Sequence, residues 1–370
     1  MLKGITVLDF SHYLPGPYAS LRLADLGATV IKIEPLFGDL ARSFDKESTA
    51  LYTANNRNKQ SIAINVKEKE GMEIALSLME KADVIIESFR PNIMNRLGLG
   101  YEDVIKRNKR IIYSSITGYG QHHDHSHLAG HDLNFMAVSG VLAQMKHNGK
   151  PFIPSITLGD EIGGMLVSES ILAALFERER TGNGCYLDLS ITDSLTMLMN
   201  NHVMLYDLYN KNNGLNALSG NEVSYCLYET GDERYVAIGA IEEKFWEGFC
   251  RFAGREDWIL QHHEKAVEGE IVYEEIKAFF LSKPFAFWEQ ASLEIDCCLT
   301  PVYEASELAD SPFTKHMITM PYVRTHKMRK VTTPPVLGEQ TSELLTKLGY
   351  DENEIMALRK KGVIAGLIPC

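Results

Sequence analysis

Two residues near the middle of the chain have side chains suited to proton transfer, and each stands where a helix is predicted to begin. His131 opens the run AGHDLNFMAVSGVL, in which apolar residues recur near helical spacing. The positive end of a helix dipole disfavours imidazolium, so a neutral His131 that accepts a proton near pH 7 is expected. Asp160 stands at the start of a longer amphipathic run, in which the Gly163-Gly164 pair would let a ligand approach the backbone closely. The backbone amides there would be available to a developing oxyanion.

Each of these residues also has a structural interpretation, which residue frequencies alone favour. An Asp ahead of a helix is a cap more often than a catalyst. A single His that opens an apolar helix is usually a hydrogen-bonded structural residue. Glu242, in IEEKFWEGF, reads by the same reasoning as an ordinary carboxylate at a helix start. The residue pattern therefore leaves catalysis and structure both open.

Composition bounds the class of protein. The chain has 370 residues and is 45% hydrophobic, enough for a large core and two domains. A formal net charge of -12 argues against nucleic acid or an anionic membrane as a partner, although a local basic pocket for a phosphorylated ligand remains allowed. The six cysteines show no CxxC spacing, no secretion signal precedes them, and no apolar run is long enough to span a bilayer. A cytoplasmic location is expected.

The elements expected around His131 and Asp160 alternate between short apolar strands and helices. Strands are predicted at residues 4–10, 28–35, 61–66, 83–89 and 110–120, and helices at residues 18–27 and 68–82. This alternation predicts an α/β fold with a Rossmann-like, mostly parallel sheet covered on both faces. Neither GxGxxG nor GxxxxGK[ST] occurs, so no standard phosphate-binding loop is present. Ligands of such sheets bind beyond the carboxyl ends of strands, near residues 13–16, 88–90 and 117–121.

A second, smaller domain is predicted in the last third of the chain. The large domain takes residues 1–205, and a polar linker is assigned to residues 206–222 because of KNNGLNALSGNE. Residues 223–305 then form an α+β domain. It begins with a hairpin that turns at Gly231-Asp232 and continues with a helix ended by Gly254.

These motifs together resemble the class III coenzyme A transferase family of the CaiB/BaiF type, and most closely its α-methylacyl-CoA racemase-like branch. The resemblance runs over nearly the whole chain, and the order and spacing of the motifs make it specific. The matching segments are VLDFSHYLPGPYAS, GATVIKIEP, NRNKQSIAINVK, ADVIIESFRPNIMNRLG, SSITGYGQ, AGHDLNFMAVSGVL, GDEIGG, ERERTGNG, GAIEEKF, DCCLTPV and PPVLGEQTSELLTKLGY.

The resemblance implies an enzyme that acts on acyl-CoA. Asp160 matches the aspartate that serves transferases as nucleophile and racemases as one of two proton-transfer bases. His131 matches the second base of the racemases, a residue that typical transferases of the family lack, and Glu242 matches the glutamate that supports this His. The implied activity is α-methylacyl-CoA racemisation by α-proton removal and return. The alternatives are CoA transfer between carboxylates through an aspartyl intermediate, and a catalytically silent acyl-CoA-binding protein.

The resemblance also implies how coenzyme A binds, as part of the substrate rather than as a prosthetic group. The implied contacts are Tyr13, Leu14, Pro15, Lys67, Ser88, Phe89, Arg90 and Arg96. Many members carry an Arg directly after the acidic residue of the second strand, but here Glu34 is followed by Pro35. We hypothesise that Arg42 or Arg57 supplies that phosphate contact instead. Each basic residue has the alternative interpretation of a solvated surface charge.

Two further expectations concern assembly and metals. The resemblance implies that residues 306–370 rejoin the large domain and that two chains interlock as a homodimer, with active sites between large and small domains of different subunits. The segment HHDHSHLAGH contains His122, His123, His125 and His127 ahead of His131. It is predicted to be an irregular loop without reliable ligand spacing such as HExxH, so no metal is expected. Family members commonly carry a Gly-Pro and an Arg where this chain has Leu128, so substrate entry or CoA contacts can differ here.

Overall fold

The computed structural model describes residues 1–43, 45–315 and 332–366, which divide into two compact units. The first unit contains Met1–Met199 together with the described residues from 332 onward, and the second begins at Asn200. Residues 206–209, predicted as the start of the linker, instead form the last turn of helix α9 (Asn200–Tyr209) in the second unit. The helix continues to Tyr209 and stops where Asn210 adopts a positive φ of 54°. None of the described helices is both long and apolar enough to cross a bilayer.

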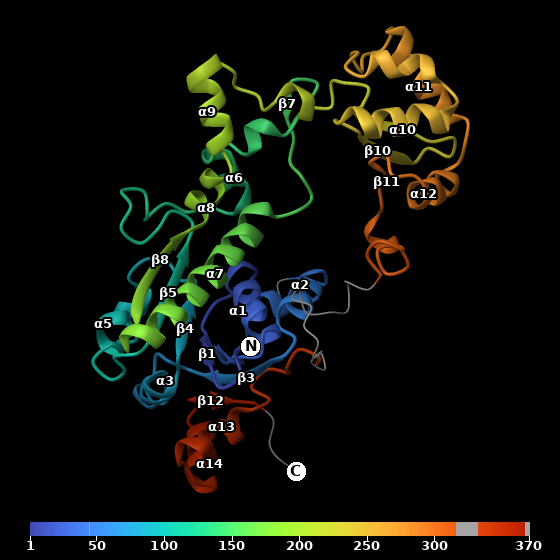
Figure 1. Cartoon of the computed structure of the whole chain (residues 1–370). Helices are drawn as coiled ribbons and strands as arrows, with labels where there is room; N and C mark the ends of the chain where they lie inside the picture. Colours follow the sequence, from blue (N-terminus) through green and yellow to red (C-terminus); the bar gives the residue numbers. More distant parts are fainter. Residues whose placement is uncertain (44, 316–331, 367–370) are drawn as a thin grey trace. The chain divides into compact units, whose positions relative to one another are not determined.

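The first unit is built on a seven-stranded sheet in the order β12-β3-β2-β1-β4-β5-β8. Its strands are β1 (Thr6–Asp9), β2 (Thr29–Glu34), β3 (Lys59–Ile64), β4 (Val84–Glu87), β5 (Ile112–Thr117), β8 (Cys185–Ser190) and β12 (Ile364–Ala365). All neighbours pair in parallel except β12, which runs antiparallel to β3 at one edge. The direction of winding reverses between β1 and β4 (Figure 1), which is where an open α/β sheet leaves a crevice for ligands.

Helices cover both faces of this sheet because its strands are apolar on both sides. Val7 faces the layer of α1 (Pro15–Asp25) and α7 (Leu158–Thr181), whereas the next residue, Leu8, faces the layer of α3 (Lys69–Lys81), α13 (Thr341–Leu348) and α14 (Glu352–Lys360). Burying one such side chain contributes about 1.5–3 kcal/mol, against about 0–1 kcal/mol for a surface ion pair. The two apolar layers therefore hold the helices in place.

The Gly163-Gly164 pair serves the packing of α7 and not, as the sequence suggested, the approach of a ligand to the backbone. Both glycines are buried. A Cβ at residue 164 would lie 2.6 Å from the backbone oxygen of Pro15 in α1, and one at residue 163 would lie 3.0 Å from the side chain of Ile191. Gly164 lets α7 lie against α1, which brings the start of α7 close to the start of α1, and Gly163 makes room for Ile191.

Several shorter elements complete the first unit. They are α2 (Ser48–Asn55), α4 (Ile93–Arg96), α5 (Tyr101–Val104), α6 (Asp132–Val138), α8 (Ile191–Met197), and the strands β6 (Lys146–His147) and β7 (Lys150–Pro151). The two short strands pair with each other, and α6 packs against α7 and α8.

The second unit is a small α+β fold. A three-stranded antiparallel sheet places β10 (Tyr235–Gly239) between β9 (Tyr225–Glu229) and β11 (Leu299–Pro301). The β9–β10 hairpin spans the predicted turn. Three helices accompany the sheet: α10 (Glu243–Ala253), α11 (Ile271–Leu281) and α12 (Phe285–Glu294). Gly254 ends α10 at a φ of 67°, as its position in the sequence predicted. The core is aromatic, with Trp246, Trp258 and Trp288 fully buried.

Candidate active site

His131 is the N-cap residue of α6, so the prediction that it opens a helix is confirmed. Its backbone is extended, its own N–H donates to Asn134 Oδ1 at 3.0 Å, and its side chain is exposed. The helix is anchored behind it by the buried ring of Phe135, which packs into a space that two glycines leave. A Cβ at Gly118 would lie 2.3 Å from that ring, and one at Gly130 would lie 2.6 Å away. The glycine before His131 therefore fixes the approach of the chain to the helix.

Asp160 lies inside the first turn of α7 rather than at its N-cap, which is Thr157. Its backbone N–H donates to Oδ1 of Asp132 at 3.0 Å, and the N–H of Glu161 donates to the carbonyl of Thr157 at 3.2 Å. These two amides are thus engaged, contrary to the expectation that they would be open to an oxyanion. Gly159 makes room for the bond, because a Cβ there would lie 2.8 Å from Asp132 Oδ1.

Asp132 therefore joins the starts of α6 and α7. It directly follows His131 in the chain and binds the backbone of Asp160. One hydrogen bond thus holds the two helix starts that carry the candidate bases at a fixed spacing, supported by the packing of α6 on α7. Sequence reasoning missed this residue. It lies next to His131 in AGHD, but nothing local indicates a partner 28 residues away.

The surroundings of Asp160 hold its proton more tightly than water would. Burial, followed by the neighbouring carboxylates of Asp132 and Glu161, raises the pKa of Asp160 to about 7. The pKa of Glu161 is also raised, by burial and by Asp132. A carboxyl group with a pKa near 7 can either accept or donate a proton at neutral pH.

Glu242 lies in the second unit, at the N-cap of α10, with an exposed side chain. Burial and then the negative charge of Glu242 raise the pKa of Cys298 in the same unit. The expected support of His131 by Glu242 stays a prediction from the resemblance.

The segment predicted to contact CoA begins in the loop between β1 and α1. Tyr13 adopts a positive φ of 63° and donates its N–H to Asp39 Oδ1 at 3.1 Å, Leu14 is buried, and Pro15 begins α1. The N–H of His12 donates to Ser88 Oγ at 3.2 Å, and the ring centroids of His12 and Phe89 lie 5.6 Å apart. The structure thus brings residues 13–15 together with Ser88 and Phe89 beyond β1 and β4, where the strand order reverses.

The basic residues predicted to contact CoA divide into exposed ones and ones engaged within the protein. The exposed residues are Lys67, Arg90 and Arg96. Arg90 also lines a cavity of about 250 Å³ beside β4, β5 and β8, together with Glu87, Ser115, Gln121 and Tyr186. Burial raises the pKa of Glu87 to about 7.

The two residues weighed as substitutes for the family arginine are engaged within the protein. Arg42 makes two hydrogen bonds to the Glu34 carboxylate, at 2.7 and 2.8 Å, and lies over the Tyr52 ring. Arg57 forms an ion pair with Asp25 at 2.5 Å. A phosphate contact by either would require it to give up or share a carboxylate partner.

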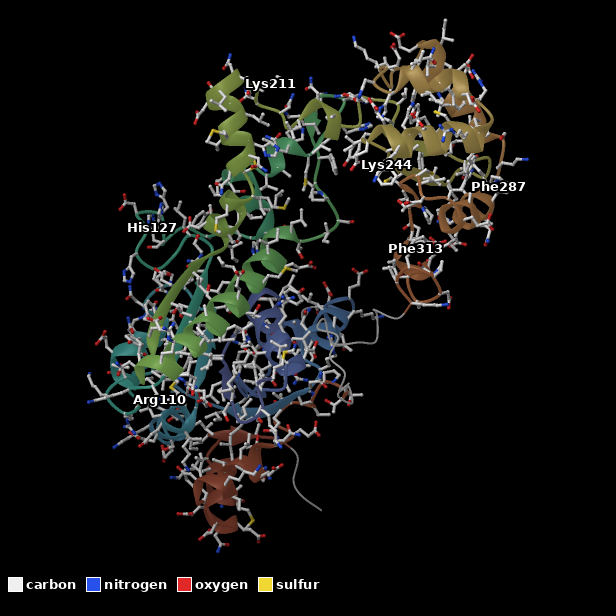
Figure 2. The ribbon with its side chains drawn as sticks, in the orientation of Figure 1. Arg110, His127, Lys211, Lys244, Phe287 and Phe313 are labelled. Carbon is white, nitrogen blue, oxygen red and sulfur yellow. The ribbon has the colours of Figure 1, made fainter. Side chains whose placement is uncertain are left out.

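The His-rich segment is a loop of turns, as predicted, with His122, His123, His125 and His127 partly or fully exposed. Figure 2 shows His127 on this loop, at the periphery of the first unit. The N–H of His125 donates to Nδ1 of His123 at 3.1 Å. Among the residues that the structure describes, no three His, Cys, Asp or Glu side chains come together in a way that could hold a metal ion.

We expect a strong chelator to leave activity and fold unchanged. The histidines of the loop lack a common centre that could bind zinc tightly. The measurement compares turnover and the melting temperature before and after dialysis against EDTA. Loss of activity that added zinc restores would contradict the prediction.

The chain matches the family described as CoA-transferase family III over residues 2–349. It is 29% identical to alpha-methylacyl-CoA racemase of Mus musculus, over 98% of this chain and 97% of the relative. It is 31% identical to succinyl-CoA:glutarate CoA-transferase of Mus musculus, over 98% and 90% of the two chains.

Solved structures share the fold. A CAIB/BAIF family protein from Brucella suis matches with a TM-score of 0.81 at 23% identity, over 94% of this chain and 98% of the other. A hypothetical protein from Mycobacterium tuberculosis matches with a TM-score of 0.77 at 27% identity, over 93% and 98%. Since the family match covers nearly the whole sequence, the chain belongs to CoA-transferase family III.

Proposed function

We propose that this family III enzyme is an acyl-CoA racemase or epimerase that inverts the carbon next to the thioester. The observation that carries the proposal is the link through Asp132, which ties the start of the helix that carries His131 to the start of the helix that carries Asp160. Inversion needs two groups that exchange protons with one carbon from opposite sides. Transfer of CoA needs only the carboxylate.

The chemistry of the two side chains fits this reaction. One base removes the weakly acidic α-proton, which leaves an enolate, and the other, already protonated, returns a proton to the opposite face. An acid–base group works best when its pKa lies near the working pH, and burial raises the pKa of Asp160 to about 7. The roles of His131 and Asp160 exchange when the opposite enantiomer is the substrate.

CoA transfer is the second candidate. The similarity to succinyl-CoA:glutarate CoA-transferase favours it, because this relative is as similar to the chain as the racemase is. In a transferase the Asp160 carboxylate would attack the thioester carbonyl and expel the CoA thiolate, giving a mixed anhydride. Only the ionised form of Asp160, whose pKa is raised by burial, could make this attack. A silent acyl-CoA-binding protein is the third candidate, and the presence of both His131 and Asp160 counts against it.

The function is tested by proton exchange. We expect a 2-methylacyl-CoA ester in deuterated water to gain deuterium at the α-carbon and to lose optical purity, with no second acid added. Movement of CoA to an added carboxylate, without such exchange, would instead establish the transferase. Absence of both reactions, with acyl-CoA binding retained, would establish the silent binder.

Two parts of the proposal rest on the family resemblance. We propose that Glu242 orients the His131 imidazole and stabilises its protonated form, as a carboxylate does for a catalytic His elsewhere. We also propose that the enzyme works as an interlocked homodimer with an acyl-CoA thioester as substrate.

A further inference from the structure

We propose that the buried Lys32–Asp39 ion pair is a positioning device that holds the loop between β1 and α1 in the shape that binds coenzyme A. The inference rests on the proposed function, because it concerns how the same substrate is held. Asp39 and Lys32 act through the loop and are positioning residues rather than catalytic ones.

The loop is tied down by side chains from two strands and from the segments that follow β2 and β4. Lys32 of β2 donates from Nζ to the carbonyl of Ser11 at 2.8 Å. Asp39 accepts the Tyr13 N–H at 3.1 Å, and Asp9 of β1 accepts the Ser11 N–H at 3.0 Å. Ser88, directly after β4, accepts the N–H of His12 at 3.2 Å. Each amide from residue 11 to residue 13 therefore has a side-chain partner.

Asp39 and Lys32 bind each other as well as the loop. Lys32 Nζ lies 2.8 Å from Asp39 Oδ2, and neither side chain is exposed to solvent. Burial opposes both charges, but the carboxylates of Asp9 and Asp39 raise the pKa of Lys32, and Lys32 lowers that of Asp39. The pair therefore stays charged. Asp39 is in turn held by its own N–H, which donates to Glu34 Oε2 at 2.9 Å.

Such a pair is a weak source of stability, since desolvation of two charges offsets most of their attraction. What it does provide is a fixed geometry. Tyr13 holds a left-handed backbone that costs a non-glycine residue free energy, and the bond from its N–H to Asp39 is a contact that compensates. The Tyr13 side chain is 40% exposed, so the clamped loop presents it to solvent directly after His12, which contacts Ser88 and Phe89.

The loop lies beyond the carboxyl ends of β1 and β4, at the reversal of strand order, where open α/β sheets bind their ligands. A loop that is already ordered loses little conformational entropy when a ligand binds. Removing Asp39 should free the Tyr13 amide and let the loop sample other conformations. The affinity for CoA should fall, while the turnover rate of bound substrate, kcat, should not.

The test measures binding of free CoA by calorimetry, with KM and kcat for the acyl-CoA substrate. For Asp39→Ala we expect the Kd of CoA and KM to rise about tenfold with kcat within about twofold, because the lost term is preorganisation. Asp39→Asn keeps an oxygen for the Tyr13 N–H and should show a smaller rise. Hydrogen exchange at the Tyr13 amide should speed up in Asp39→Ala.

Arg178→Met is the matched control. Arg178 is also buried, but it pairs with Asp83 at 2.9 Å and binds the carbonyls of Asp83 and Arg110 instead of the loop. Its CoA affinity should stay within about twofold of the parent, which separates loop positioning from loss of a buried charge. If Asp39→Ala does not fold, the test uses Asp39→Asn, with its CoA affinity and the hydrogen-exchange rate of its Tyr13 amide as the measurements.

The outcomes separate this inference from the proposed function. A parent protein that does not bind CoA would defeat the proposed function itself. A parent that binds CoA, with folded Asp39 variants that bind it equally well, would overturn the positioning role alone. An equal loss in Arg178→Met and Asp39→Ala would also overturn it. Binding of CoA is common to the racemase and the transferase, so the result does not depend on which activity is found.

Discussion

His131→Ala and Asp160→Asn should each abolish net inversion of the α-carbon, with losses of about 10²–10⁴-fold, the range that general acid–base groups contribute. In the proposed reaction both residues handle one proton from opposite faces. Removing either base breaks the path from one enantiomer to the other. The remaining base can still take a proton and return it on its own face. Each variant should therefore retain slow deuterium exchange on one enantiomer, and the two variants should prefer opposite enantiomers.

The measurement follows deuterium uptake by mass spectrometry and optical purity by chiral separation, with each pure enantiomer as substrate. His127→Ala is the matched control, because it removes an imidazole from the neighbouring exposed loop and should leave the rates unchanged. Circular dichroism melts establish that each variant is folded. The opposite preferences of the two variants are a signature that a general loss of structure cannot produce.

The competing transferase gives a different pattern. There only Asp160 becomes covalently attached to substrate, first as a mixed anhydride and then as a thioester with CoA. His131→Ala would then cost far less than Asp160→Asn. A hydroxylamine-sensitive adduct on Asp160, with near-normal activity of His131→Ala, would replace the racemase by the transferase.

Most of the fold could be predicted because it depends on short-range pattern. The buried strands of a parallel sheet are short apolar runs, so β1 to β5 lie close to the predicted positions. Helix ends were readable where one residue type is required, as at Gly254, whose left-handed conformation closes α10. The start of the linker, at residue 206, was placed inside α9, since a helical pattern that runs into a polar stretch gives no sharp boundary.

The site was predictable as residue types and not as contacts. The His131 N-cap followed from the sequence, but the bond between Asp132 and the Asp160 amide joins residues that only the packing of α6 on α7 brings together. Arg42 shows the same limit. Its charge suggested a phosphate contact, whereas the structure places Glu34 against it. A sequence lists charges, but their partners depend on which strands become neighbours.

Asp132→Asn should lower the pKa of Asp160 while leaving the backbone link intact. The side-chain amide that the substitution introduces keeps an oxygen that can accept the Asp160 N–H. The substitution removes the negative charge of Asp132, which is the second largest cause, after burial, of the raised Asp160 pKa of about 7. Burial remains, so the pKa should fall only part of the way towards its ordinary value. Glu161→Gln, which removes the third contributor without touching that hydrogen bond, should give a smaller shift in the same direction.

The two enantiomers should report this shift with opposite signs. For the enantiomer whose proton Asp160 removes, the carboxylate must be ionised, so a lower pKa moves the acidic limb of kcat to lower pH and raises activity at pH 6. For the other enantiomer Asp160 must be protonated, so the basic limb moves to lower pH and activity at pH 8 falls. pH profiles of kcat that stay unchanged for both enantiomers would contradict the prediction. Asp132→Ala, which also loses the bond, should lower kcat by up to about 10²-fold through misplacement of Asp160.

Stability should follow the same titration. The folded pKa of Asp160, about 7, lies above the unfolded value near 3.9, so the folded state binds the proton more tightly. Its contribution to stability is fully present below pH 3.9 and is lost as the pH rises through 7. Asp132→Asn narrows this gap, so its melting temperature should decline less than that of the parent between pH 5 and 8. A folded variant with shifted kinetic limbs and a flatter stability curve would tie both effects to one carboxyl group, Asp160.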